Sequence, residues 1–430
     1  MLILFVMPKL TAFSQNRNVV WVHGLGGDGT AWQHYATIFE NERKIVSTRP
    51  TYTTTSGLSP AATQLMNSWT NTTSTNIGIG HSMGGVVIRE VDRITNSNEK
   101  RFGGFITIAS PNYGAPISAN VLNGNANSVI ATAMDKLGAG PLSEFFIQIG
   151  LPWTIISGWT TTQVTNLILN NVAFMSSATN NSLKEGSTPM TTLNNFNSTA
   201  YKISIIAEET TPVHWRMAGS MFYGANSGNT PGDEKMVQVA NEIRGVYNSR
   251  YNSHKAYDKE LNWILDPVGT ALHVFLANEW KKGRDWMDQS ETIWKSLIKA
   301  TQSVTTYEWK WVAKKKDCGK PYLPPKLPHQ GDEDPLLPPK GTLCWEWEWK
   351  LVPVTVTTHH KSDGLLPVYV QELKGASGSN RYVIDHANHM ELKNMSYSKK
   401  PNGQAYDGTR NTLNAIFNRS DWFKTDKKNN

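Results

Sequence analysis

Apolar runs of strand length alternate with stretches of helical periodicity in the N-terminal part of the chain. The first three runs are each followed by apolar side chains three or four residues apart, as on the buried face of a helix. Alternating strands and helices favour parallel pairing with helices on both faces of the sheet. We therefore predict an α/β fold class with a mostly parallel central sheet flanked by helices. The predicted strands lie at residues 18–22, 44–48, 76–79 and 105–109, and the chain returns to the sheet at 201–207 and 382–384.

The alternation is interrupted twice, and the interruptions divide the chain. After Pro116 the sequence becomes strongly apolar, most densely between residues 142 and 159. The second interruption contains helical patterns at 236–247 and 286–298. The predicted segments are a leader at 1–15, a core at 16–111, a large insertion at 112–200, a core strand at 201–208, a second insertion of helices and a β-hairpin at 209–357, and the last part of the core at 358–430.

Two segments of the second insertion have a period of two. Aromatic and charged residues alternate in both, which predicts two antiparallel strands with an aromatic face and a charged face. A glutamate opposite Lys310 would fix their pairing. We favour packing of the aromatic face onto the preceding insertion, and the alternative is a surface for lipid or sugar. The alternating residues are Tyr307, Glu308, Trp309, Lys310 and Trp311 in one segment, and Trp345, Glu346, Trp347, Glu348, Trp349 and Lys350 in the other.

Composition narrows the class of protein. The chain has 430 residues, 39% hydrophobic content and a formal net charge of +7, values typical of a globular protein. Lysines are dense only at 314–316 and 424–428, so we expect no nucleic-acid partner. The acidic run 332–334 is interpreted as a solvated loop. No stretch reaches about 18 uninterrupted apolar residues, so we expect no transmembrane segment.

The N-terminus and the cysteines indicate an exported protein. Residues 1–7 are apolar, and residues 12–15 include small residues like those at a cleavage site. This pattern is typical of a signal peptide cleaved near Gln15. The alternative is a short apolar first strand, since no basic residue precedes the run and Lys9 lies just after it. In an exported chain, two cysteines favour a disulfide, here Cys318–Cys344 at the neck of the hairpin loop. We therefore expect a secreted, periplasmic or cell-surface location.

The pattern G-x-S-x-G occurs at 80–84, between the strand at 76–79 and a helix. In that setting it predicts a nucleophile elbow, a strained turn that pushes the serine hydroxyl outward. Gly80 and Gly84 are then required because side chains there would collide with the neighbouring strand and helix. Ser82 is the predicted nucleophile.

Five motifs together resemble the α/β-hydrolase family, and within it the secreted bacterial lipases. In that family the order along the chain is serine, acid, histidine. The resemblance implies Ser82 as nucleophile, Asp363 as acid and His389 as base, and a cap or lid formed by 112–200 over an acyl pocket. A lid of this kind would open at a lipid surface. The alternative is that its apolar residues simply pack inside a helical cap. The motifs are VVWVHGLGG (19–27), GIGHSMGG (78–85), ITIASPNYGAP (106–116), SDGLLPV (362–368) and ANHMELKN (387–394).

Other residues compete for the two partner roles. His386 lies three residues before His389, still at the predicted strand end. Asp385 is the alternative acid, interpreted as a strand-end or salt-bridge residue. His23 and His81 belong to motifs that support loops, so neither is expected to be the base.

The oxyanion formed on attack requires preorganised donors. By position these are the backbone N–H groups of Leu25 and Met83, with Gly24 and Gly26 allowing the loop to come close. Related lipases often bind a structural calcium near the histidine. Glu391 occupies a possible ligand position, but Met395 stands where a polar ligand is expected, so calcium is not supported.

We expect no metal and no cofactor. His359 and His360 with Asp363 have metal-like spacing, but Asp363 is assigned to the triad and exposed histidines are the simpler interpretation. The sequence predicts a secreted lipase or carboxylesterase that forms an acyl-Ser82 intermediate with an ester or lipid substrate. One alternative keeps the triad in an acyltransferase or in a hydrolase of amides, thioesters or lipid headgroups. Another is a non-catalytic surface-binding protein that uses the tryptophan hairpin.

Overall fold

The computed structural model describes most of the chain and divides it into two units. These are residues 1–301 with 360–430, and residues 302–359. The predicted leader, the apolar stretch at 142–159, Cys318 and the acidic run at 332–334 lie outside the described residues. The described residues are 17–69, 73–95, 99–126, 128, 129, 132, 176–209, 214–216, 232–317, 343–395 and 404–428.

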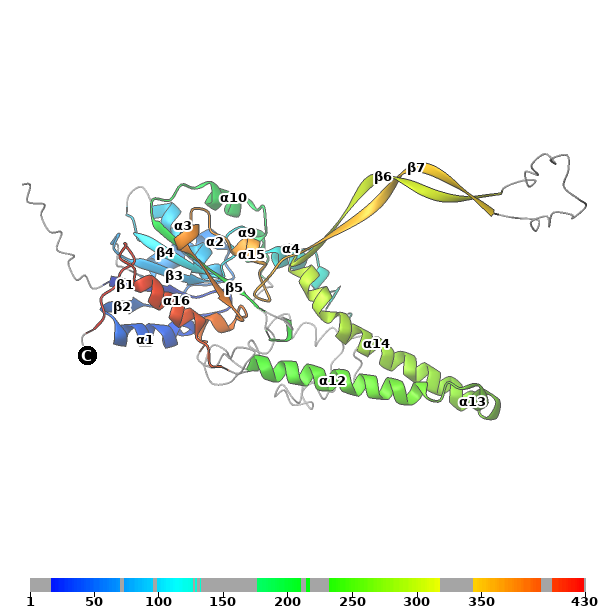
Figure 1. Cartoon of the computed structure of the whole chain (residues 1–430). Helices are drawn as coiled ribbons and strands as arrows, with labels where there is room; N and C mark the ends of the chain where they lie inside the picture. The colour runs from blue at the N-terminus through cyan, green and yellow to red at the C-terminus, as the bar shows by residue number, and fades with distance from the viewer. Residues whose placement is uncertain are drawn as a thin grey trace, which may run out of the picture. The chain divides into compact units, whose positions relative to one another are not determined.

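A parallel sheet of six strands forms the first unit, in the order β2-β1-β3-β4-β5-β8 (Figure 1). Every neighbouring pair runs parallel, so the chain crosses over between strands. The predicted α/β fold class with a mostly parallel central sheet is confirmed, including the return of the chain to the sheet after each insertion. The strands are β1 (Arg17–Val22), β2 (Ile45–Thr48), β3 (Ile77–His81), β4 (Gly104–Ile108), β5 (Tyr201–Glu208) and β8 (Arg381–Asp385).

Helices cover both faces of this sheet. Figure 1 shows α1 (Gln33–Glu42) and α16 (Gly408–Phe417) on one side, and α2 (Leu58–Asn67) and α3 (Met83–Thr95) on the other. Val19 and Trp21 pack with the first pair of helices, while Val20 and Val22 pack with the second pair. The alternation follows from the two-residue period of a strand. Each fully buried side chain of this size contributes about 2 kcal/mol, so register is strongly specified.

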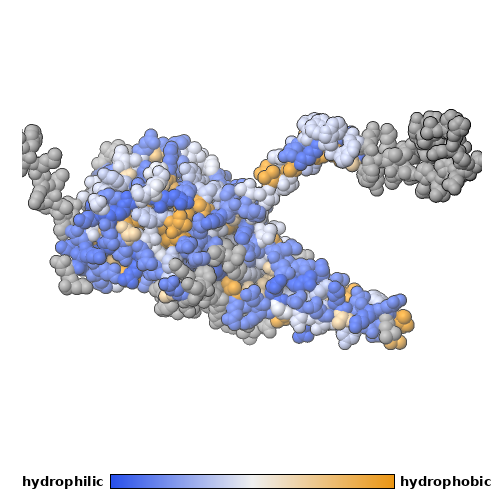
Figure 2. Space-filling model, viewed as in Figure 1, coloured by the Kyte–Doolittle hydropathy of each residue, from blue (hydrophilic) through white to orange (hydrophobic). Residues whose placement is uncertain are grey.

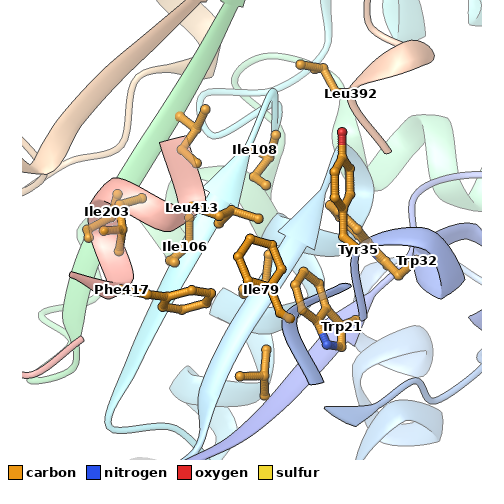
Figure 3. Packing of buried hydrophobic residues seen from close by; sticks show 14 of the residues in the cluster. Trp21, Trp32, Tyr35, Ile79, Ile106, Ile108, Ile203, Leu392, Leu413 and Phe417 are labelled. Atoms are coloured by element: carbon orange, nitrogen blue, oxygen red, sulfur yellow. The ribbon is translucent and has the colours of Figure 1, made fainter. Parts of the chain in front are cut away.

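The cluster beneath α1 and α16 combines isoleucines of the strands with aromatic rings (Figure 3). Trp21 and Trp32 lie with ring centroids 5.3 Å apart, and Phe39 meets Phe417 edge-on at 5.2 Å. Their size accounts for much of the apolar area that holds the two helices to the sheet.

The remaining described helices connect or extend the core. In the predicted segment 112–200 they are short, and two of them start with serine caps: Ser176 accepts from Thr179 N, and Ser187 from Met190 N. They are α4 (Pro116–Leu122), α9 (Ser177–Leu183) and α10 (Thr188–Asn195), with α15 (Val368–Gln371) and the 3₁₀ turns η1 (Gly29–Trp32), η3 (Gly378–Asn380) and η4 (Glu391–Lys393) elsewhere in the core.

A helical hairpin forms much of the second insertion. It consists of α12 (Gly232–Lys255), α13 (Glu260–Leu265) and α14 (Pro267–Leu297). Gly283 lies against the ring of Tyr247, which lets the two long helices approach closely. The pattern at 286–298 predicted only the last part of α14. The helix begins at Pro267 because the Asp266 side chain accepts from Gly269 N at 2.9 Å, a cap with proline at the first position.

The free end of this hairpin is apolar, and Figure 2 shows it as an orange patch. Ile264, Leu265 and Val268 are each more than seventy per cent exposed there. Among the described residues, no helix is both long enough and apolar enough to cross a bilayer.

The second unit is a two-stranded ribbon of β6 (Thr301–Asp317) and β7 (Leu343–His359). Both strands are longer than the period-two segments that predicted them. Lys310 pairs with Glu308 of its own strand at 3.0 Å, so a cross-strand glutamate does not fix the pairing as predicted. The tryptophans with described side chains are half or more exposed. Their predicted packing onto the segment 112–200 involves residues that lie largely outside the described ranges, and it stays a prediction. Two extended strands have no second layer within their own unit to bury such rings.

Candidate active site

Ser82 occupies a sharp turn between β3 and α3. Its φ is 55°, in the left-handed region that non-glycine residues rarely adopt. The turn is held by Ser82 N donating to Ile108 O at 3.0 Å and Gly85 N donating to Ser82 O at 3.1 Å. This strained backbone is the geometry of a nucleophile elbow.

Three glycines allow the chain to pack around this turn. A Cβ on Gly80 would lie 2.5 Å from the carbonyl carbon of Gly84, and one on Gly84 would collide with the carbonyl oxygens of Val22 and His23. A Cβ on Gly24 would come within 2.8 Å of Ser82 Cβ. The loop after β1 therefore lies directly beside the serine.

The predicted oxyanion donors are the N–H groups of Leu25 and Met83, the residues that follow Gly24 and Ser82 where the loop and the turn come close. Gly26 has a φ of 70°, and its N–H donates to Thr54 Oγ1 at 3.1 Å, which shapes the loop. Within the described part of the chain, the N–H groups of Leu25 and Met83 have no hydrogen-bond acceptor. Met83 is the first residue of α3, so the positive end of the helix dipole adds to its N–H.

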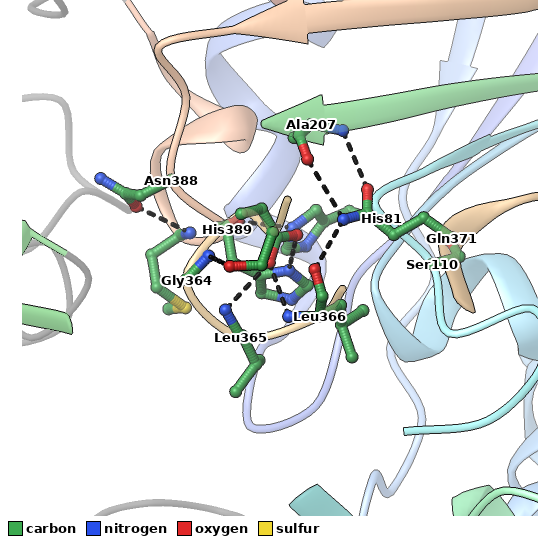
Figure 4. Close-up of polar contacts among 12 residues, drawn as sticks. His81, Ser110, Ala207, Gly364, Leu365, Leu366, Gln371, Asn388 and His389 are labelled. Atoms are coloured by element: carbon green, nitrogen blue, oxygen red, sulfur yellow. Dashed lines mark hydrogen bonds and ion pairs between the residues drawn. The ribbon is translucent and has the colours of Figure 1, made fainter. Parts of the chain in front are cut away.

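Asp363 and His389 form a buried pair. Asp363 Oδ2 accepts from His389 Nδ1 at 2.7 Å, and Asp363 O accepts from His389 N at 2.8 Å (Figure 4). Asp363 Oδ1 is occupied by the N–H groups of Leu365 and Leu366, at 2.9 and 2.7 Å. With Nδ1 acting as donor, His389 carries its basic lone pair on Nε2.

His81 connects the elbow strand to the histidine loop. Its Nε2 donates to His389 O at 2.8 Å, and the two rings lie 4.7 Å apart. Burial lowers the pKa of His81 well below its usual value, and the neighbouring His389 and Lys393 act in the same direction. His81 is therefore a neutral support for His389 rather than a base.

The structure brings Asp363 and His389 into contact and places Ser82 one residue beyond His81 at the same edge of the sheet. Ser82 Oγ and His389 Nε2 make no hydrogen bond to each other or to other described residues. Such bonds are often long or absent before substrate binds. Nε2 is thus left for a hydroxyl or a substrate.

The competing residues have other partners. His386 has a φ of 56° and lies 3.8 Å from Asp385, whose Oδ1 accepts from Tyr406 Oη at 3.3 Å. His23 stacks on Tyr52 with ring centroids 4.4 Å apart, and burial lowers its pKa. Neither His386 nor His23 makes a hydrogen bond or an ion pair with Asp363.

Glu391, the possible calcium ligand, contacts protein side chains. Its carboxylate accepts from Asn388 Nδ2 and lies 3.5 Å from the Arg216 guanidinium. The sulfur of Met395 accepts from Thr409 Oγ1 at 3.2 Å and offers no oxygen ligand. In the described ranges, no group of three or more His, Cys, Asp or Glu side chains is placed to hold a metal.

Two supporting residues were not predicted from the sequence. The buried Gln371 amide donates to Ala207 O and Leu366 O at 3.2 and 2.9 Å and accepts from Ala207 N at 2.8 Å, which ties the end of β5 to the acid loop (Figure 4). Trp294 of α14 donates to Gly364 O at 2.6 Å. The position of Gln371 within the apolar segment VYVQ was the available sequence signal. No local sequence pattern indicates the role of Trp294.

The similarities to known proteins are confined to solved structures and are weak. No protein-family model and no curated protein matches the chain. Among solved structures it is similar to an extracellular α/β-hydrolase from a Paenibacillus species, described as sharing structural and functional homology with tobacco salicylic acid binding protein 2, at 13% identity and a TM-score of 0.23, over 42% of this chain and 74% of that one. It is also similar to lipase 1 from Pelosinus fermentans at 16% identity and a TM-score of 0.27, over 46% and 70% of the two chains.

Proposed function

We propose that this chain is a serine hydrolase that cleaves carboxylic esters. Ser82 is the nucleophile, His389 the general base and Asp363 the residue that orients the base. The observation that carries the proposal is the buried Asp363–His389 pair at the sheet edge that also presents the strained Ser82 turn. A serine hydroxyl is weakly nucleophilic near neutral pH, and this arrangement supplies the base it needs.

The reaction proceeds in two steps. Ser82 Oγ attacks the ester carbonyl while His389 Nε2 accepts its proton, and Asp363 stabilises the resulting imidazolium without taking the proton. The N–H groups of Leu25 and Met83 receive the oxyanion, each worth roughly 3–4 kcal/mol in related sites. His389 then protonates the leaving alcohol. Water, activated by the same histidine, attacks acyl-Ser82 and releases the carboxylic acid.

The substrate is an ester of an apolar acyl chain, and the enzyme acts outside the cytoplasm. The apolar composition of residues 142–159 supports an acyl-binding cap, and the leader-like N-terminus supports export. Calcium and other metals are not required in this proposal.

Active-site labelling tests the nucleophile. A fluorophosphonate probe should label the wild-type chain and leave Ser82→Ala unlabelled, because the phosphorus is attacked only by an activated hydroxyl. Ser377→Ala, at an exposed position, is the matched control and should label normally. Labelling of the Ser82→Ala protein would contradict the proposal.

An ester panel tests the substrate. Rates with p-nitrophenyl esters should rise with acyl length beyond acetate if an apolar pocket receives the chain. Added alcohols should leave the free acid as the main product. A predominant transfer of the acyl group to the alcohol would instead identify an acyltransferase with the same three residues.

A further inference from the structure

One side of the ribbon formed by β6 and β7 collects aromatic rings. Ser303 Oγ lies 3.0 Å from Thr357 Oγ1, and Thr305 Oγ1 lies 3.4 Å from Thr355 Oγ1, which sets an antiparallel register. In this register the odd-numbered side chains of both strands share one face. We call it the aromatic face, and its rings are Tyr307, Trp309, Trp311, Trp347 and Trp349.

The rings contact one another across the strands. Trp311 and Trp349 have centroids 5.2 Å apart, and Trp309 and Trp349 are nearly parallel at 6.4 Å. The five exposed fractions run from 50% for Trp349 to 65% for Tyr307. Together they leave on the order of 600 Å² of aromatic surface open, at the upper limit of the patches that soluble monomers usually carry. The surface is pale in Figure 2 because Trp and Tyr have near-neutral hydropathy.

The opposite face carries the charges. Glu308, Lys310, Glu348 and Lys350 occupy even-numbered positions in the same stretch. Lys310 is paired with Glu308 at 3.0 Å, and the signs balance. Over residues 307–311 and 347–351 the ribbon is therefore amphipathic, with one side suited to water and the other to an apolar phase. At 303–305 and 355–357 the pattern reverses, because Val304 and Val356 are exposed on the even-numbered side and Ser and Thr occupy the odd-numbered positions.

The character of the aromatic face distinguishes among possible occupants. Ala313, Leu351 and Pro353 fill the positions between the rings, so no side-chain carboxylate or amide stands there to bind the hydroxyls of a sugar. Of the residues the structure describes, none accepts a hydrogen bond from the indole N–H groups of these four tryptophans. Packing two such faces together would bury four donors on each side without an acceptor.

A phospholipid interface complements this face in charge and polarity. Its ester carbonyl and phosphate oxygens are acceptors that carry partial or full negative charge, and they lie at the depth where indole rings settle. The balanced charges of the opposite face remain in water. We propose that the aromatic face docks this protein on a phospholipid bilayer, with the indole rings at headgroup level and the ribbon lying along the surface. This docking does not depend on hydrolysis at Ser82.

Vesicle binding tests the proposal. Full-length Ser82→Ala protein, which leaves lipid intact, would be co-sedimented with large unilamellar phosphatidylcholine vesicles. Combined Trp309→Ala, Trp311→Ala, Trp347→Ala and Trp349→Ala substitutions should lower the partition coefficient at least about tenfold, because each ring removed takes its apolar area and donor from the interface. Changing the same four residues to Phe should cause a smaller loss, because the apolar area remains while the donor disappears.

Matched controls keep the result interpretable. Combined Glu308→Ala, Lys310→Ala, Glu348→Ala and Lys350→Ala substitutions alter the opposite face and should change partitioning less than about threefold. With Ser82 intact, the four-tryptophan variant should hydrolyse a short soluble ester at the wild-type rate, which shows that the core is folded.

Three outcomes would overturn the proposal. The Ser82→Ala protein could fail to bind the vesicles, or could bind equally well without the four tryptophans. Sedimentation velocity could reveal a dimer that the same substitutions dissociate, which would identify a second copy as the occupant. Retention on an insoluble polysaccharide, with no retention on vesicles, would identify a sugar polymer instead.

Discussion

The acid–histidine site and the aromatic face of the ribbon place their polar groups in opposite ways. Asp363 is fully buried, and both of its carboxylate oxygens are occupied by N–H groups. Trp309, by contrast, is more than half exposed, and no described residue accepts from its indole. Because both carboxylate oxygens have hydrogen-bond partners, Asp363 is held in one rotamer and His389 in one tautomer, as a catalytic pair requires. The exposed indole N–H groups of the aromatic face can instead donate hydrogen bonds to an external partner.

The difference arises from the neighbours that each region packs against. The core site lies where β3, β5 and the two loops after β7 and β8 meet, so distant segments constrain each group. A ribbon of two strands has only cross-strand neighbours, and each such pair contributes roughly 0.2–1 kcal/mol. Perturbations should therefore have large effects in the core and small ones in the ribbon.

The largest effect is expected at the acid. Asp363→Asn should lower kcat by about 10⁴ because the amide favours the wrong tautomer of His389. The measurement is steady-state hydrolysis of p-nitrophenyl butyrate. Asp385→Asn, at the end of β8, is the matched control and should stay within severalfold of wild type. Equal losses in both variants would mean that the wrong carboxylate has been assigned.

The next effect concerns packing at the elbow. Gly84→Ala places a methyl group against the carbonyl oxygens of Val22 and His23 and should destabilise the protein by about 2–3 kcal/mol. Gly245→Ala lies in α12 with nothing within 4 Å, and should stabilise it by about 0.5–1 kcal/mol. Chemical denaturation measures both. The close-packing argument fails if Gly84→Ala is neutral.

A pH effect of intermediate size is expected from His214. Burial lowers its pKa from 6.5 to about 4. Between these values the unfolded chain binds a proton that the folded chain excludes, so stability falls as the pH drops from 7.5 to 5, by about 2 kcal/mol for this group. His214→Gln can keep the contact with Ser290 Oγ and should remove that part of the pH dependence. Unfolding curves at the two pH values measure it, and an unchanged difference would reject the assignment.

The smallest effect belongs to the ribbon. Lys310→Gln breaks an ion pair with Glu308 in which both side chains are about half exposed. Such pairs contribute about 0–1 kcal/mol, so the unfolding midpoint should barely move. A loss comparable with that of Gly84→Ala would show that the ribbon is held by its charges, and the contrast between the two regions would not hold.

Local patterns predicted the core well and the insertions incompletely. The runs at 18–22 and 201–207 became β1 and β5 within one residue at each end, since buried strands produce continuous apolar runs. The pattern at 286–298 missed residues 267–285 of α14, about five turns, because exposed apolar residues near Pro267 obscure the amphipathic period. Asp28 caps the entry to η1 by accepting from Thr30 N at 2.7 Å.

By itself the sequence determined the parallel α/β core and the strained Ser82 turn, because strand period, helix period and glycine requirements are local properties of the chain. Only the tertiary structure decided which histidine contacts Asp363, that His81 and Gln371 support this pair, and that the two strands of the ribbon have no second layer within their own unit to bury the tryptophans. Those outcomes depend on contacts between segments far apart in sequence, such as Asp363 and His389 with a sequence separation of 26, and on whether a second layer is present to bury a face.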